Sequence, residues 1–222
     1  MTIAVARSTY RNREERAAFV RDEFPECLKG RVLDVGCGDA LLRAFAEDYT
    51  GVDIEGQSDL TIDLERMACL PFEDGFFDCV VCTDVLEHLD NLHSVLEELI
   101  RVSDRFVLLS LPNMFTLGQR LLYLRGQISS RTYGLNPTNR HKWFFTFSQA
   151  REFTRHKLGE GISLRREVAV ASPNWKRRPL GDFMVGAHPN LLSMAYWALL
   201  DKRKEEPPVY GPEGRPAGSQ DV

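Results

Sequence analysis

One short segment near the N-terminus constrains the fold more than any other part of the chain. It reads Val-Leu-Asp-Val-Gly-Cys-Gly-Asp-Ala over residues 32–40, so an apolar run ends in Asp34 and in two glycines, Gly36 and Gly38. A residue without a Cβ atom permits a positive φ and a close approach of the backbone to a ligand. The segment predicts a strand, a tight turn and a helix N-terminus that hold a nucleoside-bearing ligand, although many α/β proteins turn sharply after their first strand.

Composition sets the size and the broad class of the protein. The chain has 222 residues, of which 43% are hydrophobic and 27% charged, and this fits one large domain. The net charge of -4 gives no basic excess for nucleic acid. We find no apolar leader and no apolar run long enough to span a bilayer, so we expect a cytoplasmic protein without a signal peptide or membrane span.

Strand-like apolar runs alternate with helical patterns in the first half of the chain, and this predicts a parallel sheet covered on both faces. We expect strands at 31–36, 49–54, 59–64, 76–82 and 105–111, and helices at 8–24, 40–47 and 91–102. The second half is less regular. We expect helices at 115–125 and 148–157, with Ser148 as N-cap, and a strand at 162–171; residues 191–200 fit a helix or a strand.

The expected domain organisation follows from these patterns. Residues 1–202 form a single domain, divided into the N-terminal helix, a cofactor half over 28–113 and a substrate-side half over 114–202. The remaining residues, 203–222, are rich in proline and glycine, and we predict a disordered tail.

Two of the five cysteines, Cys79 and Cys82, form a CxxC pattern that could indicate zinc or redox chemistry. They lie inside the predicted strand 76–82, where side chains three positions apart point to opposite faces of a sheet. Two thiols on opposite faces cannot share a metal ion. We therefore expect small core residues and no metal site.

Polar residues recur where the predicted strands end, and ligands of open parallel sheets bind outside those carboxyl ends. Asp53 ends the second strand, 17 residues after Gly36. Its carboxylate has two acceptor oxygens and could accept hydrogen bonds from both hydroxyls of a ribose. Asp63 and Leu64 end the third strand, and Thr83 and Asp84 follow the fourth. Any one of them could be an ordinary loop residue, but their joint recurrence indicates a ligand site.

Four segments together resemble the class I S-adenosylmethionine-dependent methyltransferases of the type-11 group. They read VLDVGCGDA, YTGVDIE, IDLERMACLPFEDGFFDCVVCTDVLEHLDNLHSVLEELIRV and FVLLSLPN, and the likeness is close over residues 28–113. The resemblance implies a Rossmann-like α/β fold with a seven-stranded, mostly parallel sheet and helices on both faces. It also implies that 192–200 is an antiparallel strand near the sheet edge, and that S-adenosylmethionine is the cofactor.

The resemblance assigns roles to residues of this chain. The glycine loop would hold the methionine part of the cofactor, Asp53 the ribose and Asp63–Leu64 the adenine, with Thr83 and Asp84 facing the sulfonium. The chain departs from many members at Ala40, where they have a third glycine. The predicted cofactor-binding residues are Asp34, Gly36, Gly38, Asp53, Ile54, Asp63, Leu64, Thr83 and Asp84.

Methyl transfer needs few catalytic groups, because a sulfonium methyl is already activated. Catalysis is mainly the positioning of the nucleophile, and a base is needed if the nucleophile carries a proton. His88 is the candidate base, although it could only shape the pocket. Cations and aromatic residues gather in the loop 129–145, which is either a binding site for an anionic or sugar-like molecule or a solvated surface loop. The candidate acceptor contacts are Asn113, Tyr133, Arg140 and His141.

A narrower resemblance keeps a second function open. The texts LPNMFTLGQRLLYLRGQISS and FTFSQAREF are similar to the methyltransferase-like methionine-biosynthesis protein W family, which assists a homoserine acyltransferase as its partner. The chain departs from that family around 133–143 and in its C-terminal extension. Its ending, HPNLLSMAYWALLDKR, resembles methyltransferases of surface-glycan and natural-product pathways instead. The hypotheses are thus a methyltransferase acting on a sugar, glycolipid or natural-product hydroxyl or amine, and an accessory protein that activates an acyltransferase.

Overall fold

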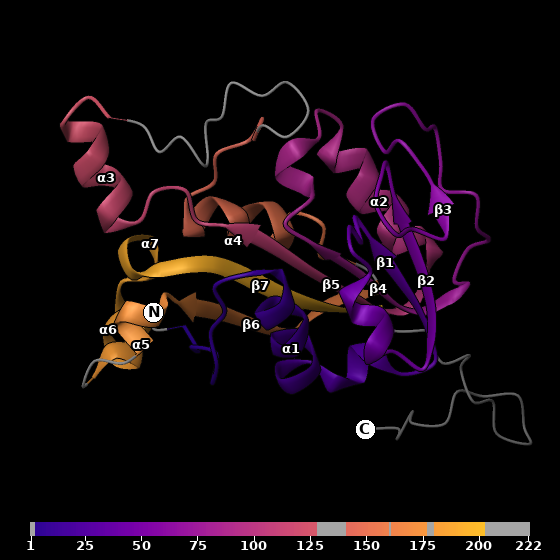
Figure 1. Cartoon of the computed structure of the whole chain (residues 1–222), viewed down its shortest axis with the longest axis horizontal. Coiled ribbons are helices and arrows are strands. Elements are labelled where there is room, and N and C mark those ends of the chain that lie inside the picture. Colours follow the sequence, from indigo (N-terminus) through magenta and orange to yellow (C-terminus); the bar gives the residue numbers. More distant parts are fainter. Residues whose placement is uncertain (1–2, 128–140, 160, 177–179, 203–222) are drawn as a thin grey trace, which may run out of the picture.

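A seven-stranded sheet forms the centre of the molecule, with strand order β3-β2-β1-β4-β5-β7-β6 (Figure 1). The computed structural model describes residues 3–127, 141–159, 161–176 and 180–202. The strands are β1 Arg31–Val35, β2 Asp48–Asp53, β3 Leu60–Thr61, β4 Phe77–Thr83, β5 Ser103–Pro112, β6 Ile162–Ala171 and β7 Ser193–Lys202. Strand β7 pairs antiparallel with both β5 and β6, while β1 to β5 pair in parallel. The predicted fold class and the antiparallel C-terminal strand are both confirmed.

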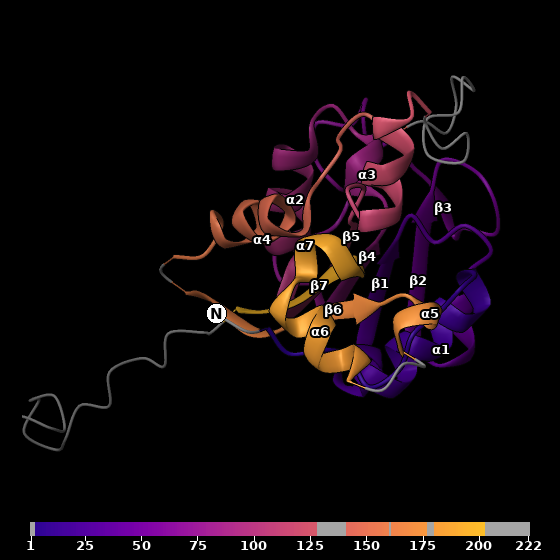
Figure 2. The same cartoon turned by 90° about the vertical axis from the view of Figure 1, so that its left-hand side faces the viewer.

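Helices cover both faces of this sheet. The α-helices are α1 Arg13–Glu23, α2 Leu92–Val102, α3 Leu117–Leu124, α4 Phe147–Arg155, α5 Pro173–Lys176, α6 Gly181–Ala187 and α7 Pro189–Leu192. Three short 3-10 helices are η1 Pro25–Leu28, η2 Leu41–Ala44 and η3 Leu86–His88. Figures 1 and 2 show α2 and α4 on one side of the sheet and α1 on the other.

The two faces of the sheet bury two separate apolar clusters, because successive side chains of a strand point to opposite faces. Cys82 packs in the cluster that contains α2 and α4, and Cys79 in the cluster that contains α1. The predicted placement of this CxxC pair on opposite faces is confirmed. Trp197 of β7 lies at the centre of the α1 cluster, with its ring centroid 4.9 Å from that of Phe19.

The helix predicted at 40–47 is wrong. Residues 41–44 form only the 3-10 turn η2, and Ala40 before it has a left-handed φ of 52°. The chain has no room for a longer helix, because β2 already begins at Asp48, whose N–H donates to the carbonyl of Gly30 over 3.1 Å. The predicted helix N-terminus beside the glycine turn is therefore replaced by a compact turn.

Other boundaries differ from the predictions as well. The N-terminal helix begins at Arg13 rather than residue 8, with the Asn12 side chain accepting from the Glu15 N–H. The third strand is only two residues long, because only Leu60 and Thr61 pair with β2. The N-cap of α4 is Thr146, not Ser148.

The N-cap of α4 shows why the expected residue was displaced. Thr146 and Gln149 form a capping box, in which each side chain bonds to the backbone N–H of the other residue. This arrangement satisfies two N–H groups that the first helical turn leaves without partners. The Ser148 Oγ atom instead accepts a hydrogen bond from the Asn190 side chain over 2.7 Å, which ties α4 to α7.

Several predictions fall beyond the described part of the chain. Tyr133, Arg140 and the tail 203–222 lie outside the described residues. Among the described helices, none combines the length and the apolar character needed to cross a bilayer.

Candidate active site

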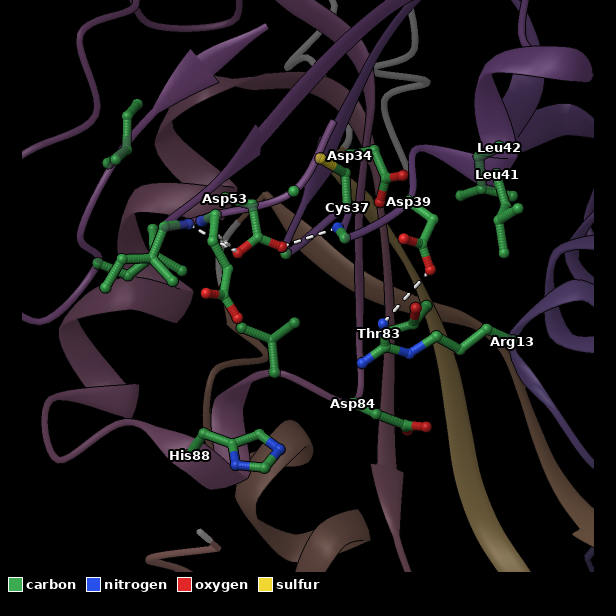
Figure 3. A pocket seen from close by; sticks show the side chains of 18 of the residues that line it. Arg13, Asp34, Cys37, Asp39, Leu41, Leu42, Asp53, Thr83, Asp84 and His88 are labelled. Carbon is green, nitrogen blue, oxygen red and sulfur yellow. Dashed lines mark hydrogen bonds and ion pairs between the residues drawn. The ribbon is translucent and has the colours of Figure 1, made fainter. Parts of the chain in front are cut away.

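A cavity of about 460 Å³ opens at the carboxyl ends of β1, β2 and β4 (Figure 3). Every residue predicted to bind the cofactor lines it, and so does His88. These residues come from four separate segments of the sequence, and the parallel sheet brings them together because its strand ends share one edge. The lining residues that were predicted for the cofactor are Asp34, Gly36, Gly38, Asp53, Ile54, Asp63, Leu64, Thr83 and Asp84.

The glycine turn after β1 packs against the segment that follows β4. Gly36 has a φ of 75°, and a Cβ atom at this position would lie 2.2 Å from Cγ2 of Val85. Any larger residue would push these two segments apart at the cavity wall. Glycine is therefore required at position 36 both by its positive φ and by the close contact.

Asp53 connects the end of β2 to this turn (Figure 3). Its Oδ2 atom accepts from the N–H of Gly38 over 2.7 Å, and its Oδ1 atom accepts from the N–H groups of Ile54 and Glu55 over 2.7 and 3.3 Å. The carboxylate is half-buried and held in one orientation by these donors. Because a carboxylate has about four lone-pair sites, it can still accept a hydrogen bond from a ribose hydroxyl. The geometry fits the predicted ribose contact.

Asp34 is the buried carboxyl group of the cavity, with an exposed fraction of 5%. The Tyr49 hydroxyl donates to its Oδ2 atom over 2.9 Å. Burial raises the pKa of Asp34 to about 6, because a low-dielectric surrounding disfavours the charged form. A cationic ligand placed beside Asp34 would favour its ionised form, and S-adenosylmethionine carries positive charge on its ammonium and sulfonium groups.

Asp84 lines the cavity but is already engaged by two neighbouring elements. Its Oδ2 atom pairs with the guanidinium of Arg16 on α1, and its Oδ1 atom accepts from the Ser110 hydroxyl over 2.6 Å. Asp84 has a left-handed φ of 54°, so these contacts hold a sharp turn at the end of β4. Its observed contacts thus fasten α1 and β5 to the cavity wall.

The N-terminal helix contributes lining residues that were missed from the sequence. Arg13, Arg16, Ala17 and Val20 of α1 all line the cavity. Arg13 also pairs with Asp39 of the glycine turn, with Nη1 and Oδ2 3.6 Å apart (Figure 3). The signal was present, since positions 13, 16, 17 and 20 follow the spacing of one helical face.

His88 lies at the end of the cavity away from Leu41 and Leu42 (Figure 3). The ring of His141 packs against that of His88, so the structure brings together a candidate base and a candidate acceptor contact. Their ring centroids are 4.6 Å apart, with an angle of 80° between the rings. Burial, followed by the neighbouring His88, lowers the pKa of His141 to about 4. His141 is therefore a neutral imidazole at ordinary pH.

Glu87 lies beneath these two histidines and was not predicted from the sequence. Its side chain is 1% exposed, and neither carboxylate oxygen has a hydrogen-bond partner within the described part of the chain. Burial, followed by the nearby Asp84, raises the pKa of Glu87 well above its ordinary value. Such a buried acid without partners is costly for a fold.

Asn113, a predicted acceptor contact, does not line this cavity. Its side-chain amide donates to the carbonyls of Pro189, Asn190 and Ser193 over 3.3, 3.1 and 2.9 Å, and its Oδ1 atom accepts from the N–H of Phe115 over 3.1 Å. The reason is the antiparallel neighbour β7, which begins beside the end of β5 and offers its backbone to the amide. Asn113 closes this junction.

Several solved structures are similar to this fold. A SAM-dependent methyltransferase from Archaeoglobus fulgidus is 17% identical, with a TM-score of 0.53 over 86% of this chain and 95% of that chain. The magnesium protoporphyrin IX methyltransferase from Synechocystis, solved with bound SAH, is 21% identical, with a TM-score of 0.50 over 86% and 81%. The cyclase SpnF is 15% identical, with a TM-score of 0.55 over 91% and 87%. At these identities the likeness concerns the fold.

The family assignment comes from the sequence of the chain itself. A family model described as a methyltransferase domain matches residues 10–155, which include α1, the glycine turn, Asp53 and the histidine pair. No curated protein matches the chain in sequence. The chain therefore belongs to the methyltransferase-domain family, and it has the Rossmann-like fold of the S-adenosylmethionine-dependent methyltransferases.

Proposed function

We propose that this protein transfers the methyl group of S-adenosylmethionine to a hydroxyl or amine of a small molecule such as a sugar, a glycolipid or a natural product. The observation that carries the proposal is the convergence of all the predicted cofactor residues on one cavity, which His88 also lines and beside which His141 packs against His88. The cofactor residues occupy the strand ends, so the histidine end of the cavity is the side left for an acceptor.

The residues of the cavity have distinct tasks under this proposal. Asp53 and Asp34 hold the cofactor, one through hydroxyl hydrogen bonds and the other through its charge. The acceptor oxygen or nitrogen attacks the methyl carbon in line, the bond between carbon and sulfur breaks, and its electron pair stays on sulfur, which yields S-adenosylhomocysteine. The proton of the acceptor passes to His88 or to water, and positioning supplies most of the rate.

Acceptor recognition is assigned to the segment that leads into His141. Tyr133 and Arg140 belong to the cation- and aromatic-rich loop of the sequence, and His141 follows directly. A guanidinium and a phenol suit a hydroxylated or anionic acceptor. This part of the proposal rests on the sequence pattern and on the position of His141 beside His88.

The fold alone does not decide the reaction, since the similar structure SpnF is described as a cyclase. The deciding experiment supplies S-adenosylmethionine with an isotope-labelled methyl group and panels of sugars, phenols and amines. We expect one labelled product, formed in equal amount with S-adenosylhomocysteine. His88→Ala should lower turnover while S-adenosylhomocysteine still binds, and His156→Ala, an exposed histidine at the end of α4, should match wild type.

An accessory role would give a different outcome. The protein would bind the cofactor, transfer no label to any acceptor, and retain a homoserine acyltransferase in a pull-down. That combination would replace the proposed methyl transfer.

A further inference from the structure

Glu87, His88 and His141 offer a carboxylate and two imidazoles at one point of the structure. One ligand atom from each of the three side chains lies within 4.8 Å of the others. The Nε2 atom of His88 and the Oε1 atom of Glu87 are 4.0 Å apart. From this constellation we propose that the protein binds one divalent transition-metal ion at the histidine end of its cavity.

The buried carboxylate of Glu87 is the first argument. Both its oxygens are enclosed and make no hydrogen bond to any described residue, and the buried Nδ1 atom of His141 is likewise without a partner there. Native structures leave very few buried polar atoms unsatisfied, so each such atom needs an explanation, and a bound ion is one of the known explanations. Here the unsatisfied atoms belong to two side chains of the same cluster.

The second argument is that the backbone holds His141 against η3 although 53 positions separate it from His88. The N–H groups of Lys142 and Trp143 both donate to the carbonyl oxygen of Glu87, over 2.8 and 3.0 Å. The Trp143 indole donates to the Leu89 carbonyl over 2.8 Å. The segment that carries His141 is therefore fastened to the segment that carries the other two donors. Such supporting contacts are what orient the ligands of a metal site.

Side-chain contacts add to this attachment. The Lys142 ammonium lies 2.7 Å from the Asp90 carboxylate and also pairs with Glu65. Lys142 thereby connects the His141 segment to Asp90, just after η3, and to Glu65, just after β3. These contacts hold the three donor residues near one another without a bound ion.

The donor set indicates which ion fits. Two imidazoles and one carboxylate form the ligand set of catalytic zinc sites and of open Fe(II) sites, whereas Mg²⁺ and Ca²⁺ prefer oxygen ligands alone. Zinc is bound at about 2.0–2.1 Å from each donor, so small rotations of the side chains would bring the three donors onto one ion. A cation would also stabilise the ionised carboxylate of the buried Glu87.

The position of the cluster indicates what such an ion could do. His88 lines the cavity, so coordination positions that the three residues leave open face the acceptor side. A bound hydroxyl loses its proton more readily next to a metal ion, which then acts as a Lewis acid. This consequence rests on the proposed function, since it assumes that a methyl acceptor enters here. The binding of the ion itself does not.

The test uses Co²⁺ as probe, because its visible absorption reports the ligands, and it needs neither cofactor nor acceptor. The metal-free full chain is titrated in a Cys69→Ser background, since Cys69 is exposed and a thiolate would compete. We expect one ion per chain with a spectrum of nitrogen and oxygen ligation. Glu87→Gln and His141→Asn should each weaken Co²⁺ binding by at least about a hundredfold. Loss of a contact that only supports a ligand already costs up to about a hundredfold, and these variants lose a ligand itself.

The controls separate this result from misfolding. Far-UV circular dichroism and thermal unfolding establish that each variant is folded; Glu87→Gln keeps the shape of the side chain. His156→Asn, at an exposed histidine outside the cluster, should bind Co²⁺ like wild type. Absence of stoichiometric binding, or binding that folded Glu87→Gln and His141→Asn leave unchanged, overturns the proposal. Neither outcome affects the methyl-transfer proposal, which is tested with labelled cofactor.

Discussion

Asp34 is a buried carboxyl group of the cavity whose ionisation is disfavoured. It is almost fully enclosed at the end of β1, and it accepts one hydrogen bond, from Tyr49. The charge of Arg16 lowers its pKa, but less than burial raises it. Burial raises its pKa to about 6 from an ordinary 3.8. The protein without its cofactor therefore carries a carboxyl group that resists ionisation, and a cationic ligand removes that penalty. Sites for ligand binding commonly sacrifice stability in this way.

The first prediction at this scale concerns Asp34→Asn. The side chain keeps an acceptor for Tyr49 and loses the ionisable group, so the cofactor-free protein should become more stable at neutral pH. A pKa that is higher by about two units in the folded state corresponds to about 3 kcal/mol at most, since one unit is 1.36 kcal/mol. Cofactor affinity should fall, because the charge that meets the cation is lost. Urea unfolding and calorimetric titration with S-adenosylmethionine measure the two effects.

The stability difference between wild type and Asp34→Asn should depend on pH. The folded state holds the Asp34 proton more tightly than the unfolded state. The contribution of Asp34 to stability is therefore fully present below about pH 4, and it is lost as the pH rises through about 6. Wild type should lose stability relative to Asp34→Asn across this window. If the two stability curves run parallel from pH 4 to pH 7, Asp34 does not titrate as the structure indicates.

At the scale of elements, Asn113 joins three segments at the end of β5. Its amide donates to carbonyls of α7 and of the first residue of β7, and these contacts close the junction that makes β7 antiparallel. The residue directly follows Pro112, where the sequence pattern indicates the end of a strand. A polar residue at that position was read as an acceptor contact, because in a purely parallel sheet it would face the ligand.

The corresponding prediction is that Asn113→Ala destabilises the fold and leaves cofactor affinity unchanged. Buried carbonyls lose their donor, which costs about 1–3 kcal/mol. Urea unfolding measures the loss, and titration with S-adenosylhomocysteine measures affinity. Gln127→Ala, at an exposed position after α3, should stay within about 0.5 kcal/mol of wild type. Unaltered stability together with a raised KM for the acceptor would restore Asn113 to the acceptor site.

Strands β1 and β5 were predictable because each buries a run of residues on both faces, over Val32–Val35 and Phe106–Leu109. The segment between β1 and β2 was not predictable in this way. Its apolar residues Leu41, Leu42 and Phe45 follow helical spacing, yet seven residues that must cross back to Asp48 leave room only for a turn. The short connection between β1 and β2 therefore outweighs the helical pattern of its residues.

The residues of the candidate site likewise include some that the sequence predicts and some that it does not. Asp34, Asp53 and Thr83 were predictable because each lies at the carboxyl end of a strand, and parallel strand ends meet at one edge. The approach of His141 to Glu87 depends instead on backbone hydrogen bonds between segments that are far apart in the sequence. No local pattern encodes such contacts. The same is true of Arg16, whose partner Asp84 lies 68 positions away.

At the scale of the whole molecule, topology places the cavity. The chain passes from β1 outward to β2 and β3, and then returns to add β4 and β5 on the other side of β1. The loops that leave β1 and β4 therefore diverge, and the crevice between them is the place where open α/β sheets bind their ligands. The described cavity lies there, between the glycine turn and the segment after β4. The central claim is that this crevice holds S-adenosylmethionine through Asp53.

Calorimetric titration with S-adenosylhomocysteine tests this claim most directly, on wild type, Asp53→Ala and Asp48→Ala. Asp48 is an exposed acid at the opposite end of the same strand, so it is a matched control. We predict one site per chain in wild type and in Asp48→Ala, and affinity lower by about tenfold to a hundredfold in Asp53→Ala, since hydrogen bonds to a charged acceptor contribute roughly 1.5–3 kcal/mol. Absence of binding to wild type, or equal affinity in all three proteins, would contradict the account.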